Sequence, residues 1–222
     1  MKMPSSASTT SLFQGLHVLV DDDPRWIWNP LQQTQAACLG GASVVQLRSK
    51  HLTDQEIVSL GLKIRESTRN AGIQFVVNDR FDLAMACEAD GVHLGQTDFP
   101  PDALPESIRQ NLRVGRSTHS LDQAHIAMEE GADYIAFGPV FETKSKDSEY
   151  EQRGLFQLRE IAERLLPHPV VAIGGITRDN LAEILAAGAR GAAVIGAVAQ
   201  AKNPRQAVGE LTAIFDSVSK TQ

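Results

Sequence analysis

A recurring junction between helix-like and strand-like segments constrains the fold of this chain more than any other feature. A helix-like stretch ends in Gly-Ala or a close variant, and a short apolar stretch follows at once. Glycine after the last helical turn adopts the left-handed conformation at no steric cost and so ends the helix. The apolar stretches show no strict alternation, which is typical of strands buried on both faces. The junctions are GGASVVQLR (40–48), CEADGVHLG (87–95), EGADYIAFG (130–138) and AGARGAAVIG (187–196).

Helix start signals lie between these strands. Thr53 and Glu56 form a T-x-x-E capping box, and Ser120 with Gln123 forms a second box of the S-x-x-Q type. Thr177 is expected to cap a helix that runs to about residue 187. The expected strands are 16–20, 43–48, 73–78, 91–94, 112–116, 134–138, 169–174 and 192–196.

Eight strands in alternation with about eight helices predict a single (β/α)₈ TIM barrel of the α/β class. The 222 residues suit one such barrel. An open doubly wound sheet is the structural alternative, but its G-x-G-x-x-G fingerprint is absent. We expect residues 12–222 to form one catalytic domain and the Ser/Thr-rich residues 1–11 to form a disordered tail.

Composition and charge exclude several classes of protein. The net charge of −6 and the lack of a basic stripe argue against a nucleic-acid partner. No apolar run approaches 18 residues, so no membrane-spanning helix is expected. Cys38 and Cys87 are too few for a disulfide framework or a zinc site, and are expected to be reduced and buried in a cytoplasmic protein. Whether the chain forms a homo-oligomer is left open.

The ends of the last two strands carry glycine, at Gly174, Gly175 and Gly196. In barrels of this kind the loops after the seventh and eighth strands often bind phosphate through backbone amides. Tight turns are the structural alternative for these glycines. Their position in the barrel therefore favours a phosphate site without proving one.

Carboxylates and cations gather at the same ends of earlier strands. Asp79 and Asp98 follow neighbouring strands and could hold Mg²⁺ together with substrate phosphate oxygens, although an Asp taken alone is more often a loop cap or an ion-pair partner. Arg48 and Lys50 occupy alternate positions of one segment, and Lys146 could join them; the alternative is solvated surface charge. Together these residues indicate a barrel enzyme that handles phosphorylated small molecules.

The motifs in chain order resemble the thiamine-phosphate synthase family. The resemblance spans nearly the whole chain, and the combination of motifs is highly specific. It is carried by VVQLRSK (44–50), VVNDR (76–80), DGVHLGQTD (90–98), VGRSTHS (114–120), FGPVFETKSK (137–146), AIGGI (172–176) and VIGAV (194–198).

The resemblance implies a Mg²⁺-dependent transferase. Such an enzyme joins hydroxymethylpyrimidine diphosphate to a (carboxy)thiazole phosphate and releases pyrophosphate. Arg48, Lys50 and Lys146 would be catalytic, because they would stabilise the charge of the leaving group, and Asp79 and Asp98 would be metal ligands. The implied substrate contacts are Gln46 with the aminopyrimidine; Arg48, Lys50, Asn78, Ser117 and Lys146 with the diphosphate; and Thr143, Ser145, Gly175, Ile195 and Gly196 with the thiazole phosphate.

The chain departs from the family pattern at a few positions. Gly196 stands where the family usually has Ser, which removes a hydroxyl from the phosphate site, and Ser145 replaces a Thr but keeps its hydroxyl. The first loop reads VDDDPRW rather than the usual Thr-Asp. The roles of residues 21–28 and 146–154 are open.

Two other functions compete with the synthase. A thiazole tautomerase of the same barrel superfamily shares GRS-x-HS and VFET, but has a catalytic His where this chain has Pro139, and tends to lack the second metal carboxylate that Asp98 supplies. His119 could be raised as a substitute proton carrier, although one His in a polar loop is more often a hydrogen-bonding residue. A degenerate barrel that binds thiamine precursors and regulates a partner is the non-enzymatic alternative.

Overall fold

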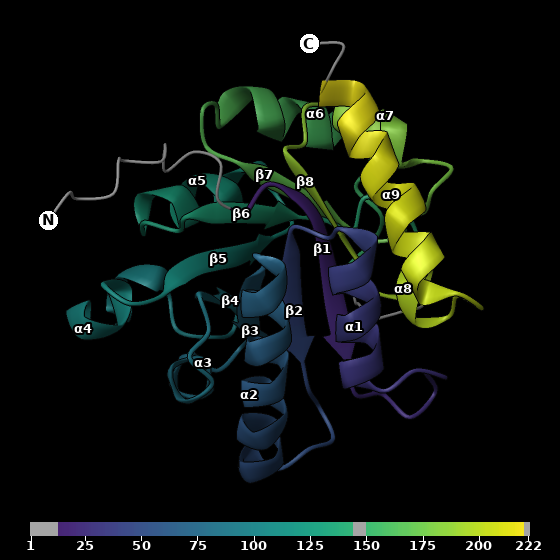
Figure 1. Ribbon diagram of the computed structural model, residues 1–222. Coiled ribbons are helices and arrows are strands. Elements are labelled where there is room, and N and C mark those ends of the chain that lie inside the picture. Colours follow the sequence, from purple (N-terminus) through teal and green to yellow (C-terminus); the bar gives the residue numbers. More distant parts are fainter. Residues whose placement is uncertain (1–12, 144–149, 220–222) are drawn as a thin grey trace, which may run out of the picture.

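Eight parallel strands close into a barrel in the computed structural model, which describes residues 13–143 and 150–219 (Figure 1). Each strand pairs with the next in the chain, and β1 pairs with β8 to complete the ring. The predicted fold class is therefore confirmed, whereas the expected tail at residues 1–11 lies outside the described residues. The strands are β1 (Gly15–Asp21), β2 (Val44–Arg48), β3 (Gln74–Asn78), β4 (Gly91–Leu94), β5 (Arg113–Thr118), β6 (Tyr134–Phe137), β7 (Val170–Ile173) and β8 (Gly191–Val194).

Helices cover the outside of the barrel, and α9 packs against α1 beside the first strand (Figure 1). No helix among the described residues has the length and apolar character needed to cross a bilayer. The helices are α1 (Pro30–Gly40), α2 (Asp54–Ala71), α3 (Phe81–Ala86), the 3₁₀ turn η2 (Pro101–Ala103), α4 (Glu106–Arg109), α5 (Leu121–Glu129), α6 (Gly154–Arg164), α7 (Leu181–Ala186), α8 (Gly196–Ala199) and α9 (Pro204–Ser219).

Local capping chemistry starts the longer helices. The side chain of Thr53 accepts a hydrogen bond from the Glu56 amide, and Glu56 returns one to Thr53, so the predicted capping box of α2 is confirmed. Ser120 likewise caps α5, but Gln123 accepts the His119 amide instead of that of Ser120. The second box is therefore only half formed.

The helix expected to start after Thr177 begins later. Residues 178–180 form a turn, and α7 starts at Leu181. The Asn180 carboxamide accepts the Thr177 amide at 2.8 Å, so this turn uses Asn180 where a Thr177 cap was expected. Leu181, Ile184 and Leu185 are buried, as the predicted apolar stripe requires.

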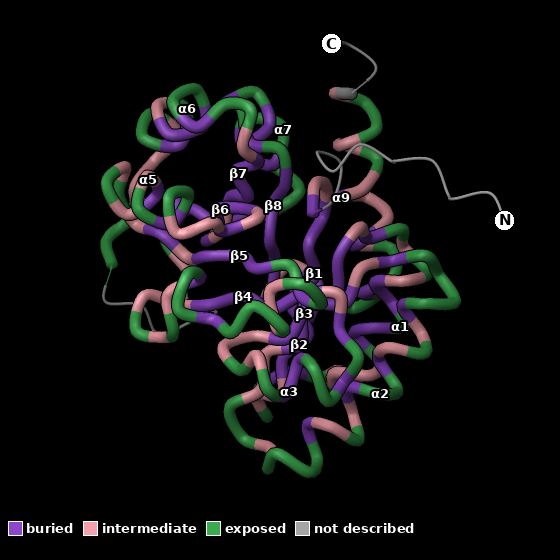
Figure 2. The backbone as a smooth tube through the Cα atoms, turned by 90° about the vertical axis from the view of Figure 1, so that its left-hand side faces the viewer, coloured by how far each residue is buried: buried purple, intermediate pink, exposed green. Residues whose placement is uncertain are grey.

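The core has two apolar layers, because successive side chains of a strand point to opposite faces. The larger layer lies between strands and helices and includes Val45 and Leu47 of β2. The smaller one fills the barrel and includes Val44 of β2, Val76 of β3 and Tyr134 of β6. Figure 2 shows buried residues along the strands at the centre and exposed residues in the surrounding loops and helices. Gln46 and Arg48 alternate with Val45 and Leu47 and thus share the inward face with Val44.

Cys87 is buried, as expected, whereas Cys38 is only partly so. Both are free thiols. Burial raises the pKa of each thiol, to about 11 for Cys87. Thiols that stay protonated are poor nucleophiles, which agrees with a structural role for both cysteines.

Candidate functional site

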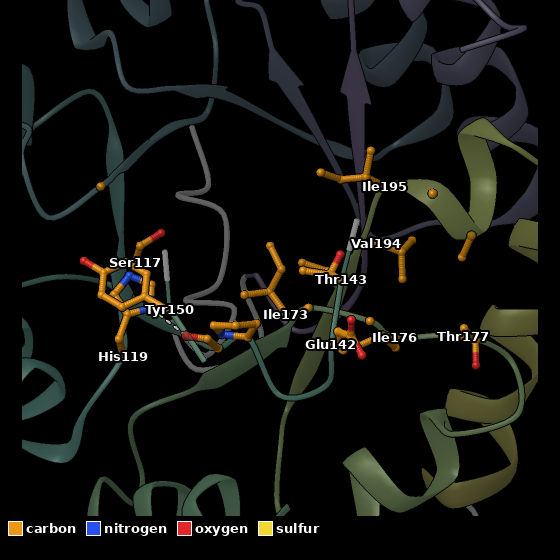
Figure 3. A pocket seen from close by; sticks show the side chains of 18 of the residues that line it. Ser117, His119, Glu142, Thr143, Tyr150, Ile173, Ile176, Thr177, Val194 and Ile195 are labelled. Atoms are coloured by element: carbon orange, nitrogen blue, oxygen red, sulfur yellow. Dashed lines mark hydrogen bonds between the residues drawn. The ribbon is translucent and has the colours of Figure 1, made fainter. Parts of the chain in front are cut away.

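A cavity of about 790 Å³ opens at the carboxyl ends of β5 to β8 (Figure 3). Ser117 contributes from β5, Thr143 from the loop after β6, and Ile195 from the end of β8. Figure 3 shows Ser117, His119 and Tyr150 on one side and Val194 and Ile195 on the other. Of the residues predicted for the site, those that line this cavity are Ser117, Thr143, Gly175, Ile195 and Gly196.

Gly174 and Gly175 are required by the backbone that packs against them. Both have positive φ, of 99° and 63°. A Cβ on Gly174 would lie 2.5 Å from the Cα of Pro139, and one on Gly175 would lie 2.5 Å from the carbonyl oxygen of Glu142. The loop after β6 therefore rests directly on this turn. The tight-turn interpretation holds for both glycines, and both also line the cavity, so a phosphate could reach their backbone.

A second cleft of about 590 Å³ adjoins the first and contains both predicted metal ligands. Asp79 and Asp98 line it, and Thr97 lines both spaces. Desolvation raises the pKa of the Asp98 carboxyl, and the negative charge of Asp79 raises it further. Two carboxylates that repel one another in a cleft are relieved by a cation, and oxygen ligands are those that Mg²⁺ prefers. The residues present fit a magnesium ion.

The described residues contain no group of three or more His, Cys, Asp or Glu side chains that could hold a metal. A cation at Asp79 and Asp98 would therefore need oxygens from water or substrate to complete its ligand set. That demand matches Mg²⁺, which usually retains waters and binds substrate phosphates.

Asp79 is fixed by its neighbours. Its backbone has φ of 67°, a conformation uncommon for residues other than glycine, and its amide donates to the carbonyl oxygen of His93 at 2.7 Å. The Lys50 ammonium lies 2.6 Å from Asp79 Oδ2, and the Asn78 amide donates to Oδ1. The structure thus brings together three of the predicted residues, Lys50, Asn78 and Asp79.

Arg48 is held by a residue that sequence reasoning missed. Its guanidinium forms an ion pair with Asp21, whose side chain is fully buried and also accepts the indole N–H of Trp26 at 2.9 Å. The Nε of Arg48 is buried and has no hydrogen-bond partner among the described residues. This orphaned donor could bind an anionic oxygen, since a buried polar group is stable only when paired.

Asp22 fastens the first loop to the segment that carries Lys50. Its carboxylate accepts the Ser49 hydroxyl and the backbone amides of Lys50, His51 and Leu52. Partial burial acts to raise the pKa of Asp22, but these hydrogen bonds outweigh it and lower the pKa. The loop 21–28, whose role the sequence left open, therefore positions Arg48 and Lys50 and does not merely connect two elements.

His119 and Tyr150 form part of the wall of the larger cavity. Their rings are stacked with centroids 3.6 Å apart, and Nδ1 of His119 donates to the Gly138 carbonyl at 2.6 Å (Figure 3). Pro139, the position of the tautomerase His, lines the same cavity. Proline has no proton to transfer at that position.

Four predicted residues do not line either space, namely Gln46, Arg48, Lys50 and Asn78, and two others cannot be described. Gln46 is buried inside the barrel and hydrogen-bonds to Tyr134, while Arg48 lies above it beside Asp21. Ser145 and Lys146 lie outside the described residues. No local sequence pattern indicates Asp21, Asp22 or Tyr134, because their roles depend on contacts between strands.

Fold and site together define a (β/α)₈ barrel with a cavity and an adjoining cleft, lined by Asp79 and Asp98, at the carboxyl ends of its strands. The family model for thiamine monophosphate synthase matches residues 16–198. Thiamine-phosphate synthase of Chloroflexus aurantiacus is 43% identical over 188 residues, which are 85% of each chain. That of Chlorobium luteolum is 40% identical over 91% of this chain and 93% of its own.

Among solved structures, thiamine phosphate pyrophosphorylase from Pyrococcus furiosus superposes with a TM-score of 0.84. It is 38% identical, and the match covers 95% of this chain and 98% of the other. The chain belongs to the thiamine monophosphate synthase family, an enzyme family of transferases. The resemblance read from the motifs is confirmed.

Proposed function

We propose that this protein condenses hydroxymethylpyrimidine diphosphate with a (carboxy)thiazole phosphate to give thiamine phosphate and pyrophosphate. The observation that carries the proposal is the junction of two spaces at Thr97, one lined by Asp79 and Asp98 and the other by Ser117 and Gly175. A diphosphate with its metal suits the acidic cleft. The larger cavity has room for the two rings and the thiazole phosphate.

Asp79 and Asp98 are the proposed Mg²⁺ ligands. When bound there, Mg²⁺ would neutralise charge on the diphosphate oxygens as a Lewis acid. Asn78 donates to Oδ1 of Asp79 and would orient the carboxylate toward the cleft, whereas Lys50 pairs with Oδ2 and would give that oxygen up to the metal. The Lys50 ammonium, once released, would bind the diphosphate beside the metal together with the Asn78 amide.

Arg48, Lys50 and Ser117 would bind the diphosphate, with Lys146 as the fourth group expected from the motifs. The buried, orphaned Nε of Arg48 supports this role, because an arriving oxygen would satisfy it. These residues act on the leaving group by charge and hydrogen bonding, without forming a covalent bond to it.

Gln46 is proposed to contact the aminopyrimidine. The thiazole phosphate would lie against Thr143, Gly175, Ile195 and Gly196, with Ser145 as the further expected contact. Glycine backbone that lines the cavity at a positive-φ turn suits close approach of a phosphate.

The reaction needs no strong nucleophile from the protein. The bond between the pyrimidine methylene carbon and the diphosphate oxygen breaks, and its electron pair leaves with pyrophosphate. The lone pair of the thiazole nitrogen then forms the new carbon–nitrogen bond, and a carboxylated thiazole loses CO₂ as the rings are joined. The cavity walls align the two rings and exclude water from the cationic centre.

The tautomerase alternative is not favoured. Pro139 cannot serve as an acid or base, and His119 donates its Nδ1 proton to a backbone carbonyl and is stacked on Tyr150. A non-enzymatic binding barrel would not need the paired carboxylates. A cytoplasmic location and any homo-oligomer stay predictions.

The test is an assay of pyrophosphate release with both substrates, each substrate alone, and both substrates with a chelator. The proposal expects release only with both substrates and Mg²⁺, and thiamine phosphate as the coupled product. Interconversion of thiazole isomers without pyrophosphate would establish the tautomerase instead. Saturable binding of both precursors without any turnover would establish the binding barrel.

A further inference from the structure

A chain of hydrogen bonds crosses the interior of the barrel and ends at the cavity. Gln46 of β2 hydrogen-bonds to the Tyr134 phenol of β6. The phenol lies 3.0 Å from Nδ1 of His93 on β4, and Nε2 of His93 lies 2.8 Å from the hydroxyl of Ser117 on β5. Four strands thus contribute one side chain each. Of these four side chains, Ser117 is the one that lines the cavity, and it ends the series of hydrogen bonds.

The barrel core packs closely around the ring of Tyr134, which lies in the middle of this series of hydrogen bonds. The Tyr134 ring stacks on Phe13 and on His93, with centroids 5.2 and 5.5 Å away, and meets the edge of His17 at 5.6 Å. A Cβ on Gly115 would lie 2.1 Å from Cζ of Tyr134, so glycine at this position clears the space for the ring. The geometry of the hydrogen bonds is therefore set by packing.

The burial of Tyr134 sets the direction of the hydrogen bonds. The residue is 1% exposed, and burial raises the pKa of the phenol, so it remains protonated. Its oxygen accepts the Gln46 amide, and its own hydrogen must find an acceptor because an unpaired buried donor is unfavourable. Nδ1 of His93 is the acceptor at hydrogen-bond distance.

The tautomer of His93 follows from this direction. A neutral imidazole that accepts at Nδ1 carries its hydrogen on Nε2, and Nε2 then donates to Ser117 Oγ. The hydroxyl hydrogen of Ser117 is consequently not used by His93. Because the Gln46 amide already donates to the phenol, the opposite direction would consume the Ser117 hydrogen and leave that of Tyr134 without an acceptor among the described residues.

We propose that His93, held by Tyr134, is a positioning residue that directs the Ser117 hydroxyl hydrogen toward the leaving diphosphate. The proposal rests on the proposed function, in which Ser117 contacts that group. Each donor in the chain polarises the next, so Ser117 becomes a stronger donor as negative charge grows on the diphosphate. The contribution is therefore larger in the transition state than in the bound substrate.

The experiment is a double-mutant cycle between His93 and Ser117. His93→Leu and Ser117→Ala are each expected to lower kcat about tenfold, with a smaller change in KM for the diphosphate. The double variant should be no slower than Ser117→Ala alone. His93→Gln, whose amide can donate to Ser117, should restore most of the rate, and Tyr134→Phe should cost about threefold only when Ser117 is present.

Two outcomes would overturn the inference. If the losses of kcat in His93→Leu and Ser117→Ala multiply in the double variant, His93 acts independently of Ser117. If His93→Gln is as slow as His93→Leu, His93 does not act as a hydrogen-bond donor to Ser117. The affinity of each variant for magnesium pyrophosphate, measured by titration, gives a second double-mutant cycle that needs no turnover. If His93→Leu folds poorly, Tyr134→Phe takes its place in this cycle with Ser117→Ala. A wild-type protein that binds pyrophosphate but forms no thiamine phosphate would refute the proposed function while this binding cycle still tests His93.

Discussion

The Lys50 ammonium lies 2.6 Å from Oδ2 of Asp79, the carboxylate proposed to bind Mg²⁺. Both groups are partly exposed, with 48% and 27% of the side chains accessible, so the pair is solvated and can separate. Lysine and metal compete for the same oxygen. Arrival of the metal would release Lys50 to the diphosphate, which links metal binding to substrate binding.

Replacing Lys50 by Gln separates these two roles. In the absence of diphosphate, Mg²⁺ should bind about threefold or more tightly, because a competing positive charge is removed. With both substrates present, KM for the diphosphate should rise about tenfold. Calorimetric titration and steady-state kinetics measure the two effects, and Lys63→Gln on the exposed face of α2 is the control. Weaker Mg²⁺ binding without diphosphate would contradict the competition.

Asp98→Asn tests the second carboxylate. The carboxylate oxygen accepts the Gly95 amide at 2.7 Å, and the Asn side-chain oxygen can keep that bond, so the loop should remain folded. We expect kcat/KM to fall on the order of 100-fold at fixed Mg²⁺ and to recover partly at higher Mg²⁺. Chelation should abolish the remaining rate.

Asp82→Asn is the matched control for Asp98→Asn. Asp82 lines the same cleft but pairs with Arg80 at 2.6 Å, and half of its side chain is exposed. Its neutralisation should leave the Mg²⁺ dependence of pyrophosphate release within about twofold, since a solvated ion pair contributes little. Equal losses in the two variants would mean that general charge in the cleft, and not ligation by Asp98, supports the reaction.

Gly175→Ala tests the turn after β7. Its φ of 63° disfavours alanine, and the added Cβ would meet the Glu142 carbonyl oxygen at 2.5 Å. The variant should lose roughly 1–3 kcal/mol of unfolding free energy, and KM for the thiazole phosphate should rise more than that for the diphosphate. Gly209→Ala in α9, where no atom lies within 4 Å of the new Cβ, should instead gain about 0.5–1 kcal/mol. Chemical denaturation and kinetics of both variants provide the comparison.

The barrel could be predicted because its signals are local. Gly131 and Gly188 end their helices in positive-φ turns immediately before β6 and β8, and both of these strands are short runs without a charged residue that need no partner to be recognised. The Thr53–Glu56 box likewise involves residues three apart. Strand order then follows from chain order, since parallel strands joined by helices become neighbours.

The interior polar contacts could not be predicted in this way. Tyr134 looks like an ordinary strand residue, and only the closed barrel brings it to Gln46 and His93. Asp21 stands in a run of three aspartates, and no local rule distinguishes the one that binds Arg48 from the one that holds the loop of Lys50. These contacts depend on register between strands, which emerges only when the ring closes.

The site residues could be predicted only through the family motifs, because residue type and spacing alone left several roles open for each of them. Spacing alone left Asp79 and Asp98 as loop caps or metal ligands, and the shared cleft now favours ligation. Gly174 and Gly175, at the end of β7, both allow a close approach of the backbone after β6 and line the cavity. A turn and a phosphate site make the same demand on the backbone, so the sequence could not separate them.

Gly196→Ser should strengthen the thiazole phosphate site. Gly196 lines the cavity at the start of α8, at the position where the motif resemblance leads us to expect Ser. One added hydrogen bond to a charged phosphate should lower KM for the thiazole phosphate about fivefold, equivalent to about 1 kcal/mol. Gly196→Ala adds the carbon without the hydroxyl and should give no gain. If both variants behave alike, backbone amides alone supply the phosphate contact.

His17 makes the stability of the barrel depend on pH. The imidazole is 1% exposed and donates to the Phe13 carbonyl at 2.8 Å. Burial lowers the pKa of His17 from 6.5 to about 4, against a smaller opposing effect of that hydrogen bond. The unfolded chain therefore binds a proton at a higher pH than the folded one. The stabilisation is complete above about pH 6.5 and is lost as the pH falls toward about 4.

His17→Gln, which can keep a donor to Phe13, should remove this dependence. Between a pH of about 7.5 and about 4.5 the wild type should lose about 2.5 kcal/mol more unfolding free energy than the variant, as the shifted pKa requires. Urea unfolding at both pH values measures the difference, and His51→Gln, at an exposed position, should behave as the wild type. Parallel losses in wild type and His17→Gln would assign the acid sensitivity to other groups. They would also mean that the interior tolerates a charged imidazole beside Tyr134, which its apolar surroundings of Phe13, Val44 and Val76 argue against.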